Sequence, residues 1–254
     1  MSWSAKQYST FEQERTRPVR DLVAAIQTPN VRHAVDLGCG PGNSTEVLAQ
    51  RFPDAQVTGL DSSEDMLASA RQRLPKVSFD LADIATWNPD QQYDVILANA
   101  SLQWVPDHAA LYPRLLSRLA PGGSLAVQTP DNLEEPAHRL AREVAAQGPW
   151  ASKISTLELP PRHPATFYYE LLQGHAANVD IWRTTYHHPL SGGHQAVVEW
   201  FKGSALRPYL QRLDEAEQAA FLARYLEAIS KAYPLLANGT VLLPFPRLFV
   251  VAQR

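Results

Sequence analysis

The sequence predicts an α/β protein whose core is a doubly wound parallel sheet, and three observations support this fold class. Between residues 31 and 129, short apolar runs alternate with segments of helical periodicity. The run at 93–100, YDVILANA, is apolar on both faces in its middle, which is typical of a buried parallel strand. The chain has 254 residues and an apolar content of 45%, enough for a large core. Right-handed crossovers between the strands are then expected.

The first half of the chain is expected to contain five strands, at residues 32–37, 55–61, 76–83, 93–100 and 124–129. Helices are expected at 43–51, 62–74 and 108–119, and APGG at 120–123 predicts a turn into the fifth strand. Asn43 is predicted as the N-cap of its helix, because Glu46 follows three residues later in a variant of the capping box.

The second half is expected to contain helices at 135–147 and 166–176 and strands at 179–188 and 240–254. Pro244 and Pro246 are expected to interrupt the last strand, because proline cannot donate to a sheet. Two further helices are expected within 193–231, split near LRPYL at 206–210. The roughly 50 residues between the last two strands are too many for a turn. They predict a helical cap, at about 190–238, over the carboxyl edge of the sheet.

Composition excludes several classes of protein. The net charge of −3 argues against general binding of nucleic acid, which requires a basic stripe. No apolar run reaches the roughly 18 residues of a membrane helix, and the N-terminal segment lacks the apolar core of a signal peptide. Cys39 is the only cysteine, so neither an internal disulfide nor a cysteine metal cage can form. We therefore expect a cytoplasmic protein, and its oligomeric state is undecided.

Three glycines at alternate positions, Gly38, Gly40 and Gly42, follow the first strand and precede a helix. Such a turn lets backbone amides approach a ligand, although glycines also serve simple tight turns. Asp61 stands at the end of the second strand, where a carboxylate can accept both hydroxyls of a ribose. A dinucleotide and an adenosine-containing sulfonium compound both remain possible. The G-x-G-x-G spacing and Asp36 favour the sulfonium compound, since an acidic neighbour suits an ammonium rather than a pyrophosphate.

Five segments resemble, in order and spacing, the signatures of class I S-adenosylmethionine-dependent methyltransferases: VDLGCGPGNST, GLDSSEDML, ADI, YDVILANASLQW and LAPGGSLAV. The resemblance implies a Rossmann-like sheet of seven strands, the last one antiparallel. It also implies that S-adenosyl-L-methionine is bound, with the 38–42 turn holding its methionine portion. The implied cofactor-binding residues are Asp36, Gly38, Gly40 and Gly42 at the turn, Asp61 and Ser62 at the ribose, Asp83 and Ile84 at the adenine, and the backbone of Ala98 and Asn99 near the methionyl group.

The resemblance implies one methyltransferase domain over residues 1–254. Residues 1–29 would form an N-terminal lid helix, with Tyr8, Phe11, Arg15 and Arg17 on or before it. Residues 30–130 would form the cofactor-binding core, and residues 131–254 would supply the last two strands and the substrate cap. Residues 147–165 have no clear counterpart in this family.

Further segments, among them NASLQWVPDH, VDIWRTTY and FPRLFVVAQR, resemble the bacterial members of this class that esterify a tricarboxylate, trans-aconitate. The expected activity is therefore formation of a monomethyl ester, with another small acid or an acyl-carrier-bound malonyl group as alternative substrates. Outside the class, the rival functions are an NAD-dependent oxidoreductase and a non-catalytic module that binds the cofactor and regulates a partner.

The chemistry of this activity requires little from the side chains. A carboxylate is already ionised at pH 7, so in-line methyl transfer needs no general base, and we expect no catalytic side chain and no metal. Arginine suits a polycarboxylate, because its guanidinium binds a carboxylate through two parallel hydrogen bonds. The substrate-binding candidates are Trp104, Arg183, Tyr186, Arg207 and Tyr209, with Arg162 and Tyr168 on the approach to the cap.

Overall fold

A computed structural model describes residues 12–157 and 162–254. The chain divides into two compact units, each of which is described by itself. The first, here called the sheet unit, comprises Met1–Pro130, Arg162–Thr184 and Arg247–Arg254, and the second, the helical unit, comprises Asp131–Pro161 and Thr185–Pro246.

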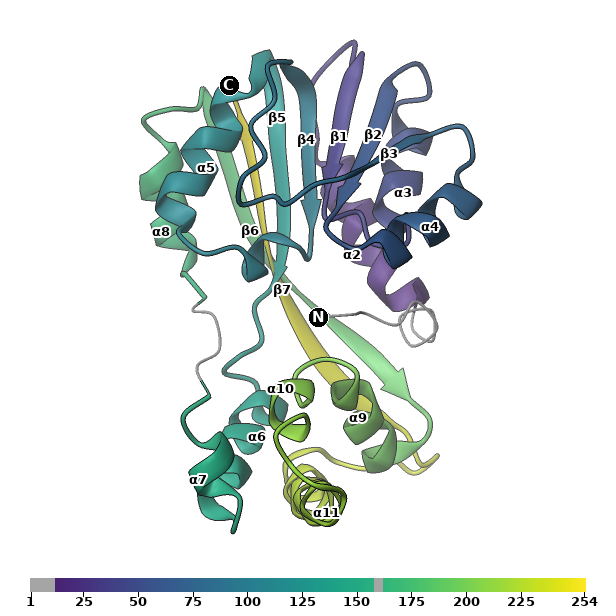
Figure 1. Cartoon of the computed structure of the whole chain (residues 1–254), viewed down its shortest axis with the longest axis vertical. Helices are drawn as coiled ribbons and strands as arrows, with labels where there is room; N and C mark the ends of the chain where they lie inside the picture. Colours follow the sequence, from purple (N-terminus) through teal and green to yellow (C-terminus); the bar gives the residue numbers. More distant parts are fainter. Residues whose placement is uncertain (1–11, 158–161) are drawn as a thin grey trace. The chain divides into compact units, whose positions relative to one another are not determined.

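The sheet has seven strands in the order β3-β2-β1-β4-β5-β7-β6 (Figure 1). They are β1 (His33–Leu37), β2 (Gln56–Asp61), β3 (Ser78–Leu81), β4 (Tyr93–Asn99), β5 (Leu119–Pro130), β6 (Asn178–Leu190) and β7 (Val241–Gln253). The pairs among the first five strands are parallel, and β7 is antiparallel to β5. The predicted fold class is therefore confirmed. Both β6 and β7 are long and run from one unit into the other.

Helices cover both faces of the sheet in this unit. They are α2 (Glu12–Ala24), α3 (Asn43–Arg51), α4 (Glu64–Arg73), η2 (Leu102–Trp104), α5 (His108–Ser117) and α8 (Ala165–Leu172). Apolar side chains of α5 and α8, such as Leu115 and Leu172, share a buried cluster with Val127 of β5 and Val250 of β7. The opposite face includes Asp36, which contacts α3, and α2 packs against α3 and β5. The carboxyl ends of the strands thus emerge between two helical layers.

The helical unit contains α6 (Pro136–Gln147), α7 (Ala151–Ile154), α9 (Gly193–Lys202), α10 (Arg207–Leu210) and α11 (Glu215–Ala232). Its core is aromatic: Trp150 contacts Phe221 edge to face, with ring centroids 5.4 Å apart. The phenol of Tyr225 donates to the carbonyl of Ala137 at 2.9 Å, which ties α11 to the start of α6. The predicted cap residues fall within this unit, and their position over the sheet stays a prediction.

Two local predictions are wrong. Asn43 is the first residue of α3 rather than its N-cap, because Gly42 occupies the cap with φ of 93° and no side chain caps the helix. The last strand is unbroken through Pro244 and Pro246. The two helices expected within 193–231 are α9 and α11, and LRPYL lies between them, with its last four residues forming the short helix α10. The APGG turn exists as an irregularity within β5, where residues 120–123 of β5 lie opposite Asp94 alone in β4. Within the described ranges, no helix is long and apolar enough to cross a membrane.

Candidate functional site

The three glycines of the 38–42 turn all have positive φ, yet each is required for a different reason. A Cβ on Gly38 would lie 2.4 Å from the Cβ of Ser101, so the turn packs there directly against the chain that leaves β4. A Cβ on Gly42 would touch Ala70 of α4 at 3.4 Å. A Cβ on Gly40 would meet nothing within 4 Å. Gly40 therefore exposes its backbone to open space, which is where a ligand can approach the turn.

Asp61 is joined to the turn by hydrogen bonds. Its Oδ2 accepts from the backbone N–H of Gly40 at 2.9 Å, and its Oδ1 accepts from the N–H of Ser63 at 2.9 Å. The carboxylate is half-buried, and each oxygen keeps acceptor capacity beyond these bonds. Ser62 is exposed beside it, and Ser63 caps α4. A hydrogen bond thus joins Asp61, at the end of β2, directly to the backbone of Gly40.

Asp36 is completely buried in β1. Its Oδ2 accepts from the hydroxyls of Ser44 and Thr45, each at 2.7 Å. Its Oδ1 has no hydrogen-bond partner among the described residues. Burial raises the pKa of this carboxyl from 3.8 to about 6; the two hydroxyls lower it, and the nearby charge of Asp61 adds to the rise. The fold therefore holds a carboxylate with one unused acceptor next to the glycine turn.

The chain leaves β4 through a strained bend. Ala98 is buried, and Asn99 ends the strand with an Oδ1 that finds no partner in the described part of the chain. Ala100 has φ of 55°, a conformation that costs a non-glycine residue roughly 1–2 kcal/mol. Ser101 then donates its hydroxyl to the carbonyl of Leu37 at 2.6 Å. This bend places the end of β4 beside the glycine turn.

The predicted adenine residues follow β3. Ile84 is half-buried near the turn, since its Cδ1 lies 3.5 Å from where a Cβ on Gly38 would be. Its carbonyl accepts from Arg114 at 3.0 Å. Asp83 is exposed, and its Oδ1 accepts from the N–H of Ala85 at 2.8 Å, so one of its oxygens also stabilises the local turn. The structure thus brings Asp36, Gly38, Gly40, Asp61, Ile84 and Asn99 to one end of the parallel strands.

The substrate-binding candidates are divided between the two units, so their convergence stays a prediction. In the sheet unit, Trp104 is 53% exposed and Arg183 is exposed on β6. In the helical unit, Tyr186 and Tyr209 are buried and Arg207 is half-buried at the start of α10. Tyr209 stacks on Phe221, with ring centroids 6.0 Å apart. Tyr8 and Phe11, and the side chain of Arg15, lie outside what the structure describes.

Sequence reasoning missed His108, which is buried between η2 and α8. Its Nδ1 lies 2.8 Å from the hydroxyl of Tyr168, and its Nε2 lies 2.9 Å from the carbonyl of Leu102. Because the carbonyl can only accept, Nε2 donates and Nδ1 accepts from the phenol. Burial lowers the pKa of His108. The histidine therefore fixes the short helix that carries Trp104, and its signal was its place in NASLQWVPDH.

Sequence reasoning also missed two buried polar side chains on neighbouring strands, Gln128 of β5 and Arg247 of β7. Gln128 is 1% exposed and Arg247 is 6% exposed. The guanidinium Nη1 of Arg247 donates to Oε1 of Gln128 at 3.4 Å. The Nε2 of Gln128 has no partner in the ranges that the structure describes. Their signal was an arginine inside the apolar segment FPRLFVV.

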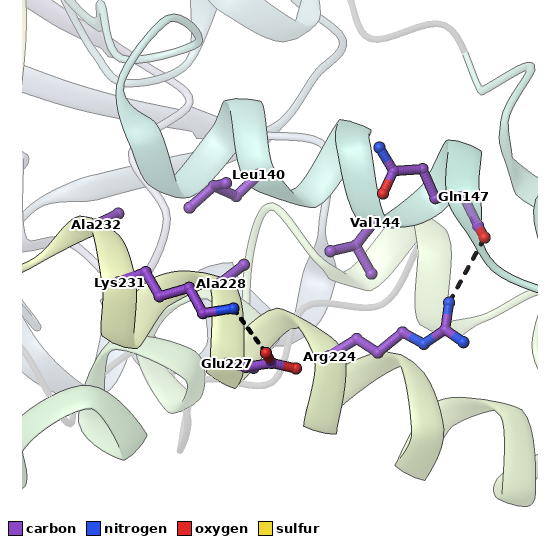
Figure 2. Close-up of a pocket in the computed structure, with 8 residues that line it drawn as sticks. All are labelled: Leu140, Val144, Gln147, Arg224, Glu227, Ala228, Lys231 and Ala232. Carbon is purple, nitrogen blue, oxygen red and sulfur yellow. Dashed lines mark hydrogen bonds and ion pairs between the residues drawn. The ribbon is translucent and has the colours of Figure 1, made fainter.

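A groove of about 410 Å³ lies elsewhere, between α6 and α11 of the helical unit (Figure 2). Its charged side chains have partners: Lys231 binds Glu227 at 2.7 Å, and Arg224 donates to the carbonyl of Gln147 at 3.5 Å. None of its lining residues belongs to the predicted site. A second hollow of about 730 Å³, beside Gly193 and Leu235, also excludes them. Both are solvated grooves of the helical unit. Among the described residues, no group of side chains could hold a metal ion.

Comparison with known proteins shows the family to which the chain belongs. A model described as a methyltransferase domain matches residues 34–123. The chain is 53% identical to the trans-aconitate 2-methyltransferase of Variovorax paradoxus, over 100% of this chain and 99% of the relative. It is 54% identical to proteins of the same name from Methylobacterium nodulans and Yersinia pestis, each over 99% of this chain and 98% of the relative. The chain belongs to the trans-aconitate 2-methyltransferase family.

Solved structures agree with this assignment at the level of the fold. The YcgJ protein of Bacillus subtilis superposes with a TM-score of 0.62 at 12% identity, over 94% of this chain and 98% of the other. A phosphoethanolamine N-methyltransferase of Haemonchus contortus gives a TM-score of 0.54 at 15% identity, over 93% of this chain and 52% of the other. The methyltransferase class, the fold and S-adenosylmethionine as the cosubstrate are thereby confirmed, against the oxidoreductase alternative. The relatives are named for action on trans-aconitate, a small carboxylic acid.

Proposed function

We propose that this chain transfers the methyl group of S-adenosylmethionine to a carboxylate oxygen of trans-aconitate, giving a monomethyl ester and S-adenosylhomocysteine. The observation that carries the proposal is identity of 53–54% over essentially the whole chain with relatives named for this reaction. Full-length identity matters because it includes the helical unit and the last two strands, beyond the methyltransferase domain at 34–123.

Three features of the sheet unit fit the cosubstrate. Gly40 leaves its peptide open to a ligand, and Asp61 next to it offers acceptors to the two hydroxyls of a ribose. Asp36 Oδ1 and Asn99 Oδ1 are buried acceptors without partners among the described residues. An ammonium group is a donor of three hydrogen bonds, so it suits two such acceptors. The methionine ammonium is therefore assigned to Asp36 and Asn99, in addition to the backbone contacts of Ala98 and Asn99.

The remaining cofactor-binding residues are assigned according to the strands that they follow. Ile84 packs on the adenine, and Asp83 accepts from its amino group. Ser62 lies beside the ribose. For the acid, Trp104 and Arg183 of the sheet unit are the proposed contacts, and Tyr186, Arg207 and Tyr209 of the helical unit stay predictions from the sequence. When bound, S-adenosylmethionine supplies a methyl group on a positively charged sulfur.

The residues of the chain contribute to this reaction by aligning the two substrates and by binding their charged groups. The acid's carboxylate is ionised at neutral pH, so no residue has to remove a proton. Its binding groups hold one oxygen in line with the methyl carbon, and alignment of this kind supplies on the order of 7–11 kcal/mol in favourable cases. The C–O bond forms as the C–S bond breaks, and the sulfur keeps the electron pair. Because opposite charges cancel in this step, exclusion of water by the protein favours it.

The test is a panel assay with purified full-length protein, measuring S-adenosylhomocysteine by mass spectrometry. The panel contains trans-aconitate, cis-aconitate, citrate and a malonyl-loaded acyl carrier protein. We expect turnover with trans-aconitate and a product heavier by one methylene unit. Turnover with another acid alone would assign the function to that acid. Cosubstrate binding without any turnover across the panel would instead favour a non-catalytic role.

A further inference from the structure

Four polar side chains lie on one face of the sheet near the carboxyl ends of adjacent strands. Asp36 of β1 is in register with Leu97 of β4, so Asn99, two residues further, points to the same side. Asn99 is in register with Gln128 of β5. Gln128 is in register with Phe249 of β7, so Arg247, two residues away, shares this face too. The row therefore crosses β1, β4, β5 and β7 in that order.

The row is sorted by hydrogen-bond type. On β1 and β4, the atoms without partners among the described residues are acceptors, the Oδ1 of Asp36 and the Oδ1 of Asn99. On β5, the atom without a partner within the described ranges is a donor, the Nε2 of Gln128. On β7, Arg247 carries only donors. One half of the row thus suits a cation, and the other half suits an anion.

The contact between Gln128 and Arg247 prepares the anionic half. Because the guanidinium donates to Oε1 of Gln128, the amide presents its Nε2 hydrogens instead. A guanidinium has five N–H donors, more than the contact with Gln128 uses. Both side chains are more than nine-tenths buried, so entry of a ligand must uncover them. Shielding from water then strengthens each charge-assisted hydrogen bond to the ligand.

We propose that Gln128 and Arg247 bind one carboxylate of the acid substrate, a carboxylate that is not methylated. This inference rests on the proposed function. The alternative ligand is the carboxylate of the methionine portion. Neighbouring strands are about 4.8 Å apart, so β7 lies roughly 10 Å from β4. The acceptors that suit the ammonium lie on β1 and β4, at the other end of the row from Arg247, which favours the substrate at Gln128 and Arg247.

The decisive variant is Gln128→Leu, which removes the donor and keeps Arg247. Binding is measured by calorimetry with S-adenosylhomocysteine present, for trans-aconitate and for three dicarboxylates that each lack one of its carboxyl groups: glutaconate, itaconate and methylfumarate. We expect trans-aconitate to bind roughly ten- to hundredfold more weakly to the variant. The dicarboxylate that lacks the recognised carboxyl should bind both proteins equally. Arg247→Lys tests the guanidinium, because an ammonium keeps the charge and loses the paired geometry.

The matched controls are Gln253→Leu and Arg254→Met at the other end of β7. There Gln253 donates to Gly122 and Arg254 donates to Ser117, away from the carboxyl ends. Both controls should bind trans-aconitate as the wild type does. Equal weakening of all four acids, no weakening, or a loss confined to S-adenosylhomocysteine would overturn the inference. Failure of the wild-type protein to bind or methylate trans-aconitate would instead remove the proposed function on which it rests.

Discussion

The buried carboxyl of Asp36 leads to a quantitative prediction about pH. Its pKa of about 6 in the fold, against an ordinary value of 3.8, means that the folded chain holds a proton that the unfolded chain has lost. Each pH unit between these values changes the free energy of unfolding by about 1.36 kcal/mol. Asp36 therefore removes about 3 kcal/mol of stability as the pH rises from about 4 to about 6, and nothing more above that.

The perturbation is Asp36→Asn, which keeps an oxygen for the hydroxyls of Ser44 and Thr45 but cannot ionise. The free energy of unfolding of variant and wild type is compared by urea denaturation between pH 3 and pH 8. The difference should shift in favour of the variant by about 3 kcal/mol between the two ends. For a chain of this size the shift corresponds to roughly 6–12 °C in Tm. Parallel curves for the two proteins would refute the argument that burial controls this carboxyl.

Ligand affinity should respond in the opposite sense. If the ammonium of the bound nucleoside pairs with Oδ1 of Asp36, binding requires the ionised carboxylate. The wild-type affinity for S-adenosylhomocysteine should then rise about fivefold from pH 5 to pH 6, reach about tenfold by pH 7 and level off above that, with a proton released on binding below pH 6. In Asp36→Asn the affinity should be lower at pH 7.5 and flat over this range. A pH dependence that survives the substitution would assign the titration to another group and remove Asp36 from the binding site.

Three further predictions concern the same unit. Gly38→Ala should lower Tm by several degrees because of its overlap with Ser101, whereas Gly40→Ala should mainly weaken S-adenosylhomocysteine binding; thermal scans with calorimetry check this, and the reverse pattern would contradict it. Because the fold favours the neutral ring of His108, the wild type should lose stability as the pH falls below about 6.5, and His108→Phe should reduce this loss. The free energies of unfolding from urea curves at pH 5 and pH 8 test this. Cys39 should resist thiol reagents until the protein unfolds, because burial raises the pKa of its thiol; fast labelling of the folded chain would show the opposite.

The cofactor half of the site was predictable because it is local in sequence. The glycine spacing, the apolar strand before it and Asp61 at the end of the next strand all lie within 34–61, and parallel pairing of consecutive strands brings them together. The sequence could not show that the three glycines of the 38–42 turn have different structural roles. Only the structure shows that Gly38 packs on Ser101, that Gly42 caps α3, and that Gly40 faces open space.

Sequence reasoning did not find the pair of residues proposed here to bind a carboxylate of the acid, because they are distant in sequence. Gln128 and Arg247 are 119 residues apart and meet only because the last strand inserts antiparallel beside β5. Arg183, Tyr186, Arg207 and Tyr209 were chosen for residue type and for neighbours along the chain. That reasoning does not reveal burial, and two of the four, Tyr186 and Tyr209, are buried in the helical unit.

The sorted polar row gives the proposed reaction a physical rationale. Methyl transfer joins a cationic donor to an anionic acceptor and leaves two neutral groups, so the site must hold opposite charges close together before they cancel. In the proposed complex, the acceptors on β1 and β4 would stabilise the cation's ammonium, and the donors on β5 and β7 would stabilise a carboxylate that keeps its charge throughout. Neither set neutralises the reacting carboxylate or the sulfur. Because the binding energy goes to groups that do not react, it aligns the substrates without stabilising the charges that the transition state has to lose.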